Sequence, residues 1–274
     1  MISFVDHVLI LTGDLSTLIP PYETLGFEVV RGGVHPQGTE NALIPLADGS
    51  YLELIAAPTP EIARKSRYWQ RADGGLRGYG EYGGYACNCG DLDGDAAGMR
   101  ARGLAVEGPM DGSRQRPDGQ MVRWKRVYPE HLDLPAAVQD VTPHTLKIAP
   151  PTRGVGLHAR MAAVVVLVPD AGAAARLYEQ FLGRAREERP EAKGRDRHFP
   201  LPQGRVIVRE PAPGTPAREH LERKGSGLYE VVLAVRGWPG TLGPLEGHLR
   251  RDGDARLIDP ALTGGVRILV EPDR

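Results

Sequence analysis

An internal repeat is the feature that most constrains how this chain can fold. An apolar segment that begins at Val5 is followed by Asp14, a helix-like stretch and then Gly26. The same punctuation recurs at Asp91 and Gly103, and again at Asp170 and Gly183. An aspartate can cap the first turn of a helix by accepting backbone N–H bonds, and a glycine suits the left-handed position at its end. Each copy therefore predicts a strand followed by a helix.

The ends of two copies also match without a gap. The segment IPLADGSYLELIAAP begins at residue 44, and FPLPQGRVIVREPAP begins at residue 199. Asp48-Gly49 and Gln203-Gly204 are typical of hairpin turns, in which glycine supplies a positive φ. Each unit is thus predicted as a strand, a helix and about three strands. Four such units start near residues 4, 84, 160 and 227, and the fourth is a weaker copy with a helix around 241–249 and a strand at 265–270.

Composition and charge narrow the class of protein. The 274 residues include 34 Lys and Arg against 35 Asp and Glu, so no overall field favours nucleic acid or an anionic membrane. No apolar run approaches the roughly 20 residues of a membrane span, and the N-terminus lacks the features of a signal peptide. We therefore expect a soluble, cytoplasmic protein. The 35 Gly and 24 Pro residues favour short strands and tight turns over a helical bundle.

Several polar residues lie where an ordinary core would not place them. Glu53 is in the middle of the apolar run YLELI, where an ionised carboxylate needs a cation, a hydrogen-bond partner or a proton. His7 lies in the first apolar segment. A salt bridge from Glu53 to an arginine, or an ion pair between His7 and Glu53, would satisfy these groups without any function. Cys87 and Cys89 are too close together for the usual disulfide geometry and are expected to be buried thiols.

Other candidates lie in loops and at strand ends. His35 follows two glycines that would let the backbone approach a ligand closely. Asn41 could orient a substrate carbonyl. Trp124 could line a ligand-binding cavity or belong to the hydrophobic core. Arg114 or Arg116 could clamp a carboxylate with two parallel hydrogen bonds, although 117–119 reads first as a turn. The histidines at 144, 158, 198, 220 and 248 show no ligand spacing, and we assign them no role.

Three motifs carry a resemblance to a known family. These are DHVLILTGDL, GGVHPQGTENALIPLADGSYLELIA and SRQRPDGQMVRW, which together span roughly residues 4 to 143. With the paired βαβββ pattern, they resemble the vicinal oxygen chelate superfamily of glyoxalase I, extradiol dioxygenases and bleomycin or fosfomycin resistance proteins, and more narrowly its glyoxalase-like domain proteins. The resemblance implies an α+β fold of four βαβββ units, paired into two modules with cupped mixed sheets. We expect modules at 1–143 and 159–274, joined by a linker at 144–158.

The resemblance also implies a site in the first cup. In the superfamily, metal ligands come from the first and last strands of a unit, which are the positions of His7 and Glu53 here. Imidazole and carboxylate suit Zn, Mn, Fe, Co or Ni. The set is incomplete, because the corresponding positions are Gly84 and about Val138 in unit two and Ala163 and Val208 in unit three. A third ligand, such as His35 or Gln139, would have to join His7 and Glu53.

These observations leave alternative functions open. The first is a metal-dependent lyase, isomerase or dioxygenase acting on a small oxygen-rich metabolite, with His7 and Glu53 as catalytic or metal-ligating residues and His35, Asn41, Arg116 and Trp124 contacting substrate. The second is a metal-free protein that binds or sequesters a small molecule, as resistance proteins of the superfamily do. A third reading makes the second half a degenerate copy that serves only packing or formation of a homodimer. We predict that His7 and Glu53 lie close together in the first cup, and that the second cup is apolar and binds no metal.

Overall fold

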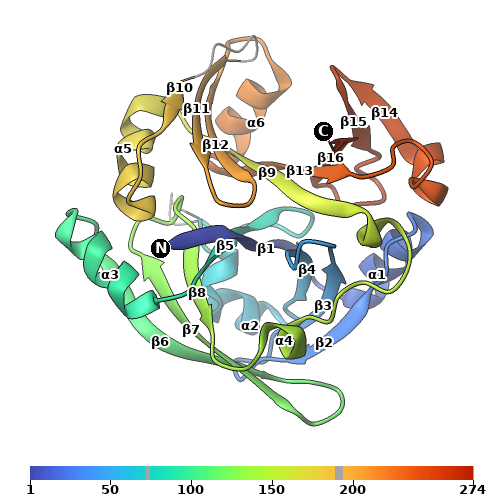
Figure 1. Ribbon diagram of the computed structural model, residues 1–274, viewed down its shortest axis with the longest axis horizontal. Helices are drawn as coiled ribbons and strands as arrows, with labels where there is room; N and C mark the ends of the chain where they lie inside the picture. The colour runs from blue at the N-terminus through green and yellow to red at the C-terminus, as the bar shows by residue number, and fades with distance from the viewer. Residues whose placement is uncertain (72–74, 189–193, 274) are drawn as a thin grey trace.

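The computed structural model describes residues 1–71, 75–188 and 194–273, and these form two eight-stranded sheets with helices packed around them. Figure 1 shows the two sheets as adjacent halves of the molecule, with the N-terminal strand running along their boundary. The predicted α+β fold of two glyoxalase-like modules is confirmed. Within the described residues, no helix is long and apolar enough to cross a membrane.

The first module is a closed barrel built from two βαβββ units. Unit one comprises β1 (Ile2–Thr12), α1 (Leu15–Thr24), β2 (Val30–Val34), β3 (Glu40–Pro45) and β4 (Tyr51–Ala56). Unit two comprises β5 (Tyr82–Cys89), α3 (Leu92–Ala101), β6 (Val106–Gln115), β7 (Met121–Pro129) and β8 (Ala136–Asp140). The strand order is β1-β4-β3-β2-β6-β7-β8-β5, and β5 returns to pair with β1. The first strands of the two units therefore lie side by side, as do the second strands β2 and β6.

A glycine allows the short pairing of two strands that closes this barrel. Strands β2 and β6 meet through the pairing of Val34 with Gln115. Gly33, next to this contact, has φ +132, and a Cβ there would lie 1.8 Å from the carbonyl oxygen of Gln115. Any side chain at this position would push the two strands apart, so the barrel closes only because the residue is glycine.

The second module repeats the plan in an open sheet. Unit three comprises β9 (Ala159–Leu167), α5 (Ala171–Leu182), β10 (Glu187–Glu188), β11 (Gly194–Pro200) and β12 (Arg205–Pro211). Unit four comprises β13 (Gly227–Val235), the 3₁₀ helix η3 (Gly243–His248), β14 (Leu249–Asp252), β15 (Ala255–Ile258) and β16 (Arg267–Pro272). The α-helix expected around 241–249 is thus replaced by a 3₁₀ helix, in a segment that has Pro244 in its first turn. The last strand begins two residues later than predicted.

The repeated aspartates act as the sequence predicts. Asp14, Asp91 and Asp170 accept hydrogen bonds from backbone N–H groups in the first turns of α1, α3 and α5. These helices pack on the outer faces of the sheets, and the apolar cluster beneath them runs from one module into the other. Within this cluster, the hydroxyl groups of Tyr85 and Tyr178 lie 2.9 Å apart. The two modules therefore share one core.

Two helical connections that the repeat did not predict lie on the inner faces of the sheets. In the first module, α2 (Pro60–Lys65) and η1 (Arg67–Trp69) connect the two units, and buried Trp69 packs with Leu9 and Leu11 of β1. In the second module, α6 (Pro216–Lys224) has the equivalent place and packs through Leu221 against Leu167 of β9. These connections fill part of each cup and restrict the space available to a ligand.

Candidate functional site

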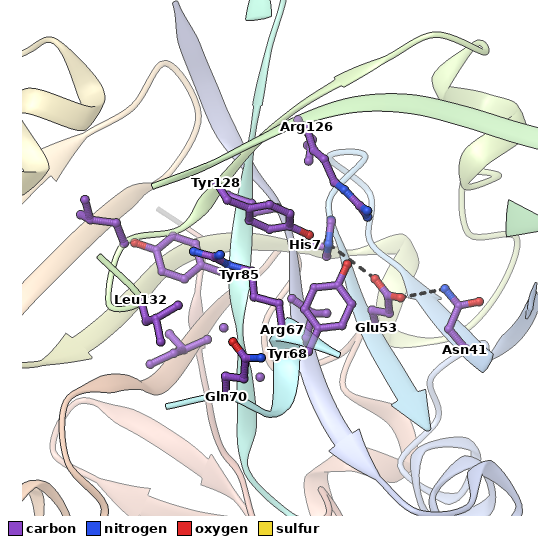
Figure 2. Close-up of a pocket in the computed structure, with 18 of the residues that line it drawn as sticks. His7, Asn41, Glu53, Arg67, Tyr68, Gln70, Tyr85, Arg126, Tyr128 and Leu132 are labelled. Atoms are coloured by element: carbon purple, nitrogen blue, oxygen red, sulfur yellow. Dashed lines mark hydrogen bonds and ion pairs between the residues drawn. The ribbon is translucent and has the colours of Figure 1, made fainter. Parts of the chain in front are cut away.

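The first barrel encloses a cavity of about 90 Å³ (Figure 2). This is several times the roughly 10–15 Å³ that one water molecule needs, so the cavity can hold a small organic group. It is lined by strands of both units, by η1, by the segments on either side of β8 and by the first residues of β13 in the second module. The polar and aromatic lining includes His7, His35, Asn41, Tyr51, Glu53, Arg67, Tyr68, Tyr85, Arg114, Trp124, Arg126, Tyr128 and Lys147.

His7 and Glu53 lie close together in this cavity, as predicted. Nε2 of His7 is 3.5 Å from Oε2 of Glu53, and the second carboxylate oxygen accepts a 2.8 Å hydrogen bond from Nδ2 of Asn41. In the described part of the chain, no arginine forms an ion pair with Glu53, so of the two structural pairings considered above only the one between His7 and Glu53 is present. Figure 2 shows the three side chains in one row.

Strand geometry explains why both side chains face inward. Strands β1 and β4 are parallel neighbours, and Glu53 shares the inner face of β4 with Tyr51 and Ile55. His7 shares the inner face of β1 with Leu9, but the expectation that Val5 also faces inward is wrong. The pairing of β1 with β5 is irregular between Val5 and His7, and this shift moves Val5 into the outer core.

Asp6, which the sequence analysis did not single out, fixes the orientation of His7. Its Oδ1 lies 2.7 Å from Nδ1 of His7, and Oδ2 accepts a 2.8 Å hydrogen bond from Asn88. Burial alone would raise the pKa of Asp6, but the Lys147 ammonium and the His7 ring outweigh burial and hold that pKa well below its ordinary value. The hydrogen bond to Asp6 occupies Nδ1 of His7, so Nε2 is the ring nitrogen that faces Glu53.

Lys147 comes from the segment expected to be only a linker. Residues 144–158 contain α4 (His144–Lys147) and the 3₁₀ helix η2 (Val155–Leu157). Nζ of Lys147 is buried, 2.9 Å from Oδ2 of Asp6 and 2.6 Å from Oδ1 of Asp140. Both carboxylates raise its pKa against the opposing effect of burial. The ammonium therefore holds the Asp6 side of the site in place.

His144 has a structural role that its lack of ligand spacing did not suggest. Its Nδ1 lies 2.7 Å from Oδ2 of Asp140, and its Nε2 lies 2.8 Å from the carbonyl oxygen of Gly49. Asp6, Asp140 and His144 offer ligand atoms within 4.8 Å of one another. Lys147 lies between the two carboxylates and supplies the positive charge there, so we interpret this cluster as an ion-pair network rather than a metal centre.

The remaining predicted site residues divide into those inside and those outside the cavity. His35 lines it, with Nδ1 3.0 Å from the hydroxyl group of Thr39 and its ring at 89° to that of Trp124. Burial lowers the pKa of His35, which favours the neutral ring. Arg116 lies outside the cavity, where it pairs with Asp118 at 3.0 Å. The position of Arg116 therefore does not support the predicted contact with a substrate.

Arg114 and Arg126 supply positive charge to the cavity in place of Arg116. Arg114 is buried and donates to the carbonyl oxygen of Lys147, and Arg126 reaches in from β7 (Figure 2). Alternation along β7 could have revealed Arg126 and Tyr128, because both follow Trp124 at a spacing of two residues on the same face. Of these three side chains, only Trp124 was predicted to contact a substrate.

A divalent metal would find two protein donors in the cavity. Nε2 of His7 and the carboxylate of Glu53 converge, and the bond from His7 to Asp6 is the support that histidine ligands usually have. In the described ranges, no third His, Cys, Asp or Glu completes a set with both of them within 4.8 Å. Gly84 and Val138, at the corresponding positions of unit two, line the cavity without offering a donor. The donor set fits a weakly held cation whose other ligands come from water or substrate.

In the second module, the sequence match places Ala163 and Val208 at the positions of His7 and Glu53, and neither side chain offers a ligand atom. Ala163 lies with Val165 and Ile207 in an apolar cluster on the inner face of the sheet. The prediction of a wholly apolar cup is nevertheless wrong, because Asp196 forms an ion pair with Arg209 at 2.6 Å, and both are buried. The charges in this cup are used for internal pairing.

Comparison with known proteins places the chain in a family. The model of the glyoxalase-like domain family matches residues 5–182, which is more than half of the sequence, and the chain belongs to this family. The match ends with α5, so it includes the whole first module and the start of the second. No curated protein matches the chain.

Solved structures agree with this fold at low sequence identity. A hypothetical protein from Staphylococcus aureus is 14% identical, with a TM-score of 0.69 over 98% of this chain and 99% of that one. A mutant of 4-hydroxymandelate synthase from Streptomyces coelicolor is 14% identical, with a TM-score of 0.58 over 98% and 92%. A fusion of a xylose isomerase-like TIM barrel with 4-hydroxyphenylpyruvate dioxygenase is 10% identical, with a TM-score of 0.60 over 98% of this chain and 48% of that one. These similarities concern the fold.

Proposed function

We propose that the first barrel is the active site of an enzyme that moves a proton on a small, oxygen-rich metabolite. The observation that carries this proposal is the 3.5 Å approach of Nε2 of His7 to Glu53 in a cavity large enough for a ligand. Two groups able to accept a proton thus face the same enclosed space. The family membership and the dioxygenase-type structural neighbours support a small-molecule enzyme.

Different side chains would have different roles in such a reaction. Asp6 holds the Nδ1–H group of His7, so Nε2 can accept a proton from a hydroxyl group or from carbon next to a carbonyl. Asn41 keeps the carboxylate of Glu53 turned toward His7. Arg114 and Arg126 provide positive charge where negative charge would develop on substrate oxygen.

His7 and Glu53 are also the residues that would hold a divalent metal. When bound, such a metal would polarise neighbouring substrate oxygens and favour loss of the proton. In that arrangement His7 would serve as a ligand. Glu53 would serve as a second ligand or as the group that accepts the proton. A lyase, an isomerase and a dioxygenase all remain consistent with this chemistry.

One observation favours an alternative without catalysis. The positions that correspond to His7 and Glu53 in unit two are Gly84 and Val138, so the chain supplies only half of a two-unit ligand set. A protein that binds a small molecule in the barrel and releases it unchanged would need no complete set. This alternative predicts ligand binding without turnover.

The experiment that tests the proposal combines metal analysis with detection of proton exchange. Protein purified without a histidine tag or chelator is examined by elemental analysis, and a panel of small hydroxy and oxo acids is incubated with it in D₂O and followed by NMR. We expect deuterium uptake by at least one compound, and its loss in His7→Gln and Glu53→Gln. Glu219→Gln is the control, because Glu219 is exposed on α6 of the second module and does not line the cavity. Uptake that persists in both site variants contradicts the proposal.

A further inference from the structure

Among the described residues, Arg126 is a cation in the cavity that forms no ion pair. It lies on β7 among the residues that line the barrel, and its Nε is buried and makes no hydrogen bond. Within the described residues, no carboxylate oxygen lies within 4.0 Å of its guanidinium group, and its recorded contact is with the ring of Tyr128, 5.4 Å from the centroid. A buried N–H donor without an acceptor is unfavourable, so a ligand oxygen that accepts a hydrogen bond from Arg126 would bind favourably there.

Neighbouring charges increase the need for an anion. The guanidinium group of Arg67 lies over the same Tyr128 ring, 4.6 Å from its centroid, so two cations share one aromatic side chain. Arg114, also in the lining and nine-tenths buried, donates to a backbone carbonyl rather than to a carboxylate, and its Nε is unsatisfied as well. Lys147 differs, because Asp6 and Asp140 balance its charge. Arg67 pairs with exposed Glu107 at 3.9 Å, so among the described residues of the lining it is Arg114 and Arg126 that are cationic and form no ion pair.

The orientation of Arg126 relates this charge to the candidate catalytic pair. Figure 2 shows its side chain extending from β7 into the space bordered by His7, Tyr68 and Glu53. A planar guanidinium group offers two parallel N–H donors, which match the two oxygens of a carboxylate. A ligand held in this way would present the atoms next to its carboxylate to His7 and Glu53.

We infer that Arg126 is the anchor of a carboxylate-binding subsite, and that the metabolite bound in the barrel is a small carboxylic acid. This inference rests on the proposed function for the place of the reacting atoms. Binding of a carboxylate does not require turnover, so the two can fail separately. Arg67 and Arg114 contribute positive charge to the subsite, while Arg126 makes the paired hydrogen bonds.

The test uses a matched pair of probes that differ in charge and little in shape. Benzoate and its neutral amide, benzamide, are titrated into metal-stripped full-length protein by isothermal calorimetry, with inorganic phosphate as a third probe. The variants are Arg126→Gln, Arg126→Lys and Arg123→Gln. Arg123 is an exposed arginine on the same strand and does not line this cavity, so its variant controls for overall charge.

We expect benzoate to bind the wild-type protein at least tenfold more tightly than benzamide and phosphate. Arg126→Gln should abolish this preference, Arg126→Lys should restore it only in part, and Arg123→Gln should leave it unchanged. The same titration on Glu53→Gln should retain the preference, because Glu53 is assigned to proton transfer rather than to the carboxylate. Equal binding of benzoate and benzamide by the wild type, tighter binding of phosphate, or a preference that survives Arg126→Gln would overturn the inference. If the wild-type protein prefers benzoate but exchanges no proton with any compound of the panel, only the proposed function is contradicted.

Discussion

Nζ of Lys147 lies 2.9 Å from Oδ2 of Asp6, although 141 residues separate the two in sequence. Lys147 belongs to α4, just after the last strand of the first barrel, and Asp6 belongs to its first strand. The pair therefore fastens the end of the barrel to its beginning. It also places a positive charge behind the carboxylate that orients His7, so the architecture of the module and the chemistry of the site depend on the same contact.

Removal of the Lys147 ammonium should destabilise the protein strongly. Lys147→Met retains most of the aliphatic side chain but leaves Asp6 and Asp140 as neighbouring buried charges, and breaking a buried pair in this way costs about 3–5 kcal/mol. Lys125→Met is the matched control, because Lys125 forms an exposed pair with Asp93 that is worth less than about 1 kcal/mol. Urea unfolding measures both free energies. Similar losses in the two variants would show that Lys147 is not the structural fastening described here.

Asp6 should stabilise the folded protein at neutral pH, and this contribution should be lost at acid pH. Its pKa in the folded protein lies well below the ordinary value of 3.8, so its contribution is full above pH 3.8 and is lost as the pH falls below that value toward the folded pKa. Asp6→Asn should therefore lower the free energy of unfolding at pH 7 by about 2–4 kcal/mol and should flatten its decline at acid pH. Urea unfolding at intervals between pH 7 and pH 2 checks both effects. A variant that follows the wild-type curve at a constant offset would contradict this assignment.

His144 should make a contribution with the opposite sign. Its hydrogen bond to Asp140 is the main cause of a pKa raised above 6.5 in the folded protein, against the opposing effect of burial. The stability that protonated His144 provides is full below pH 6.5 and is lost as the pH rises through the folded pKa. His144→Gln should therefore lower stability more at pH 5.5 than at pH 9. His158→Gln provides a control histidine, and an unchanged pH slope in His144→Gln would count against the proton-dependent bond.

The fold could be predicted from the repeat because the repeat consists of local signals, which are helix caps and hairpin turns. The helix caps at Asp14, Asp91 and Asp170 depend on backbone geometry within a few residues, and the hairpin turn at Gly49 depends on a positive φ of its own residue. Such signals can be read from sequence without knowledge of the rest of the chain. The connections α2 and α6 carry no part of the repeat, so their packing inside the cups could not be read in the same way.

The site was predictable only where a residue was locally unusual. Glu53 was evident because a carboxylate interrupts an apolar strand, and its approach to His7 followed from the position of both strands. Asp6 lies beside His7 in sequence, but strict alternation would place it on the opposite face, and the irregularity in β1 was not visible. Lys147 reaches the site through a contact across almost the whole first module, which no local pattern records.

At Gly84, which lines the cavity, a substitution separates the effect of a steric clash from the effect of backbone strain. It corresponds to His7 in unit two, has φ +119, and a Cβ added there would meet no atom within 4 Å. Gly84→Ala should therefore cause no steric clash but should destabilise the protein by about 1–3 kcal/mol, since a side chain rarely adopts such a backbone angle. Gly90→Ala is the control. Gly90 also has open space around it and is not in the positive-φ region, so an alanine there should leave stability within about 1 kcal/mol of the wild type. Urea unfolding of the two variants distinguishes the effects, and equal stabilities would mean that the backbone of β5 can relax around the cavity without cost.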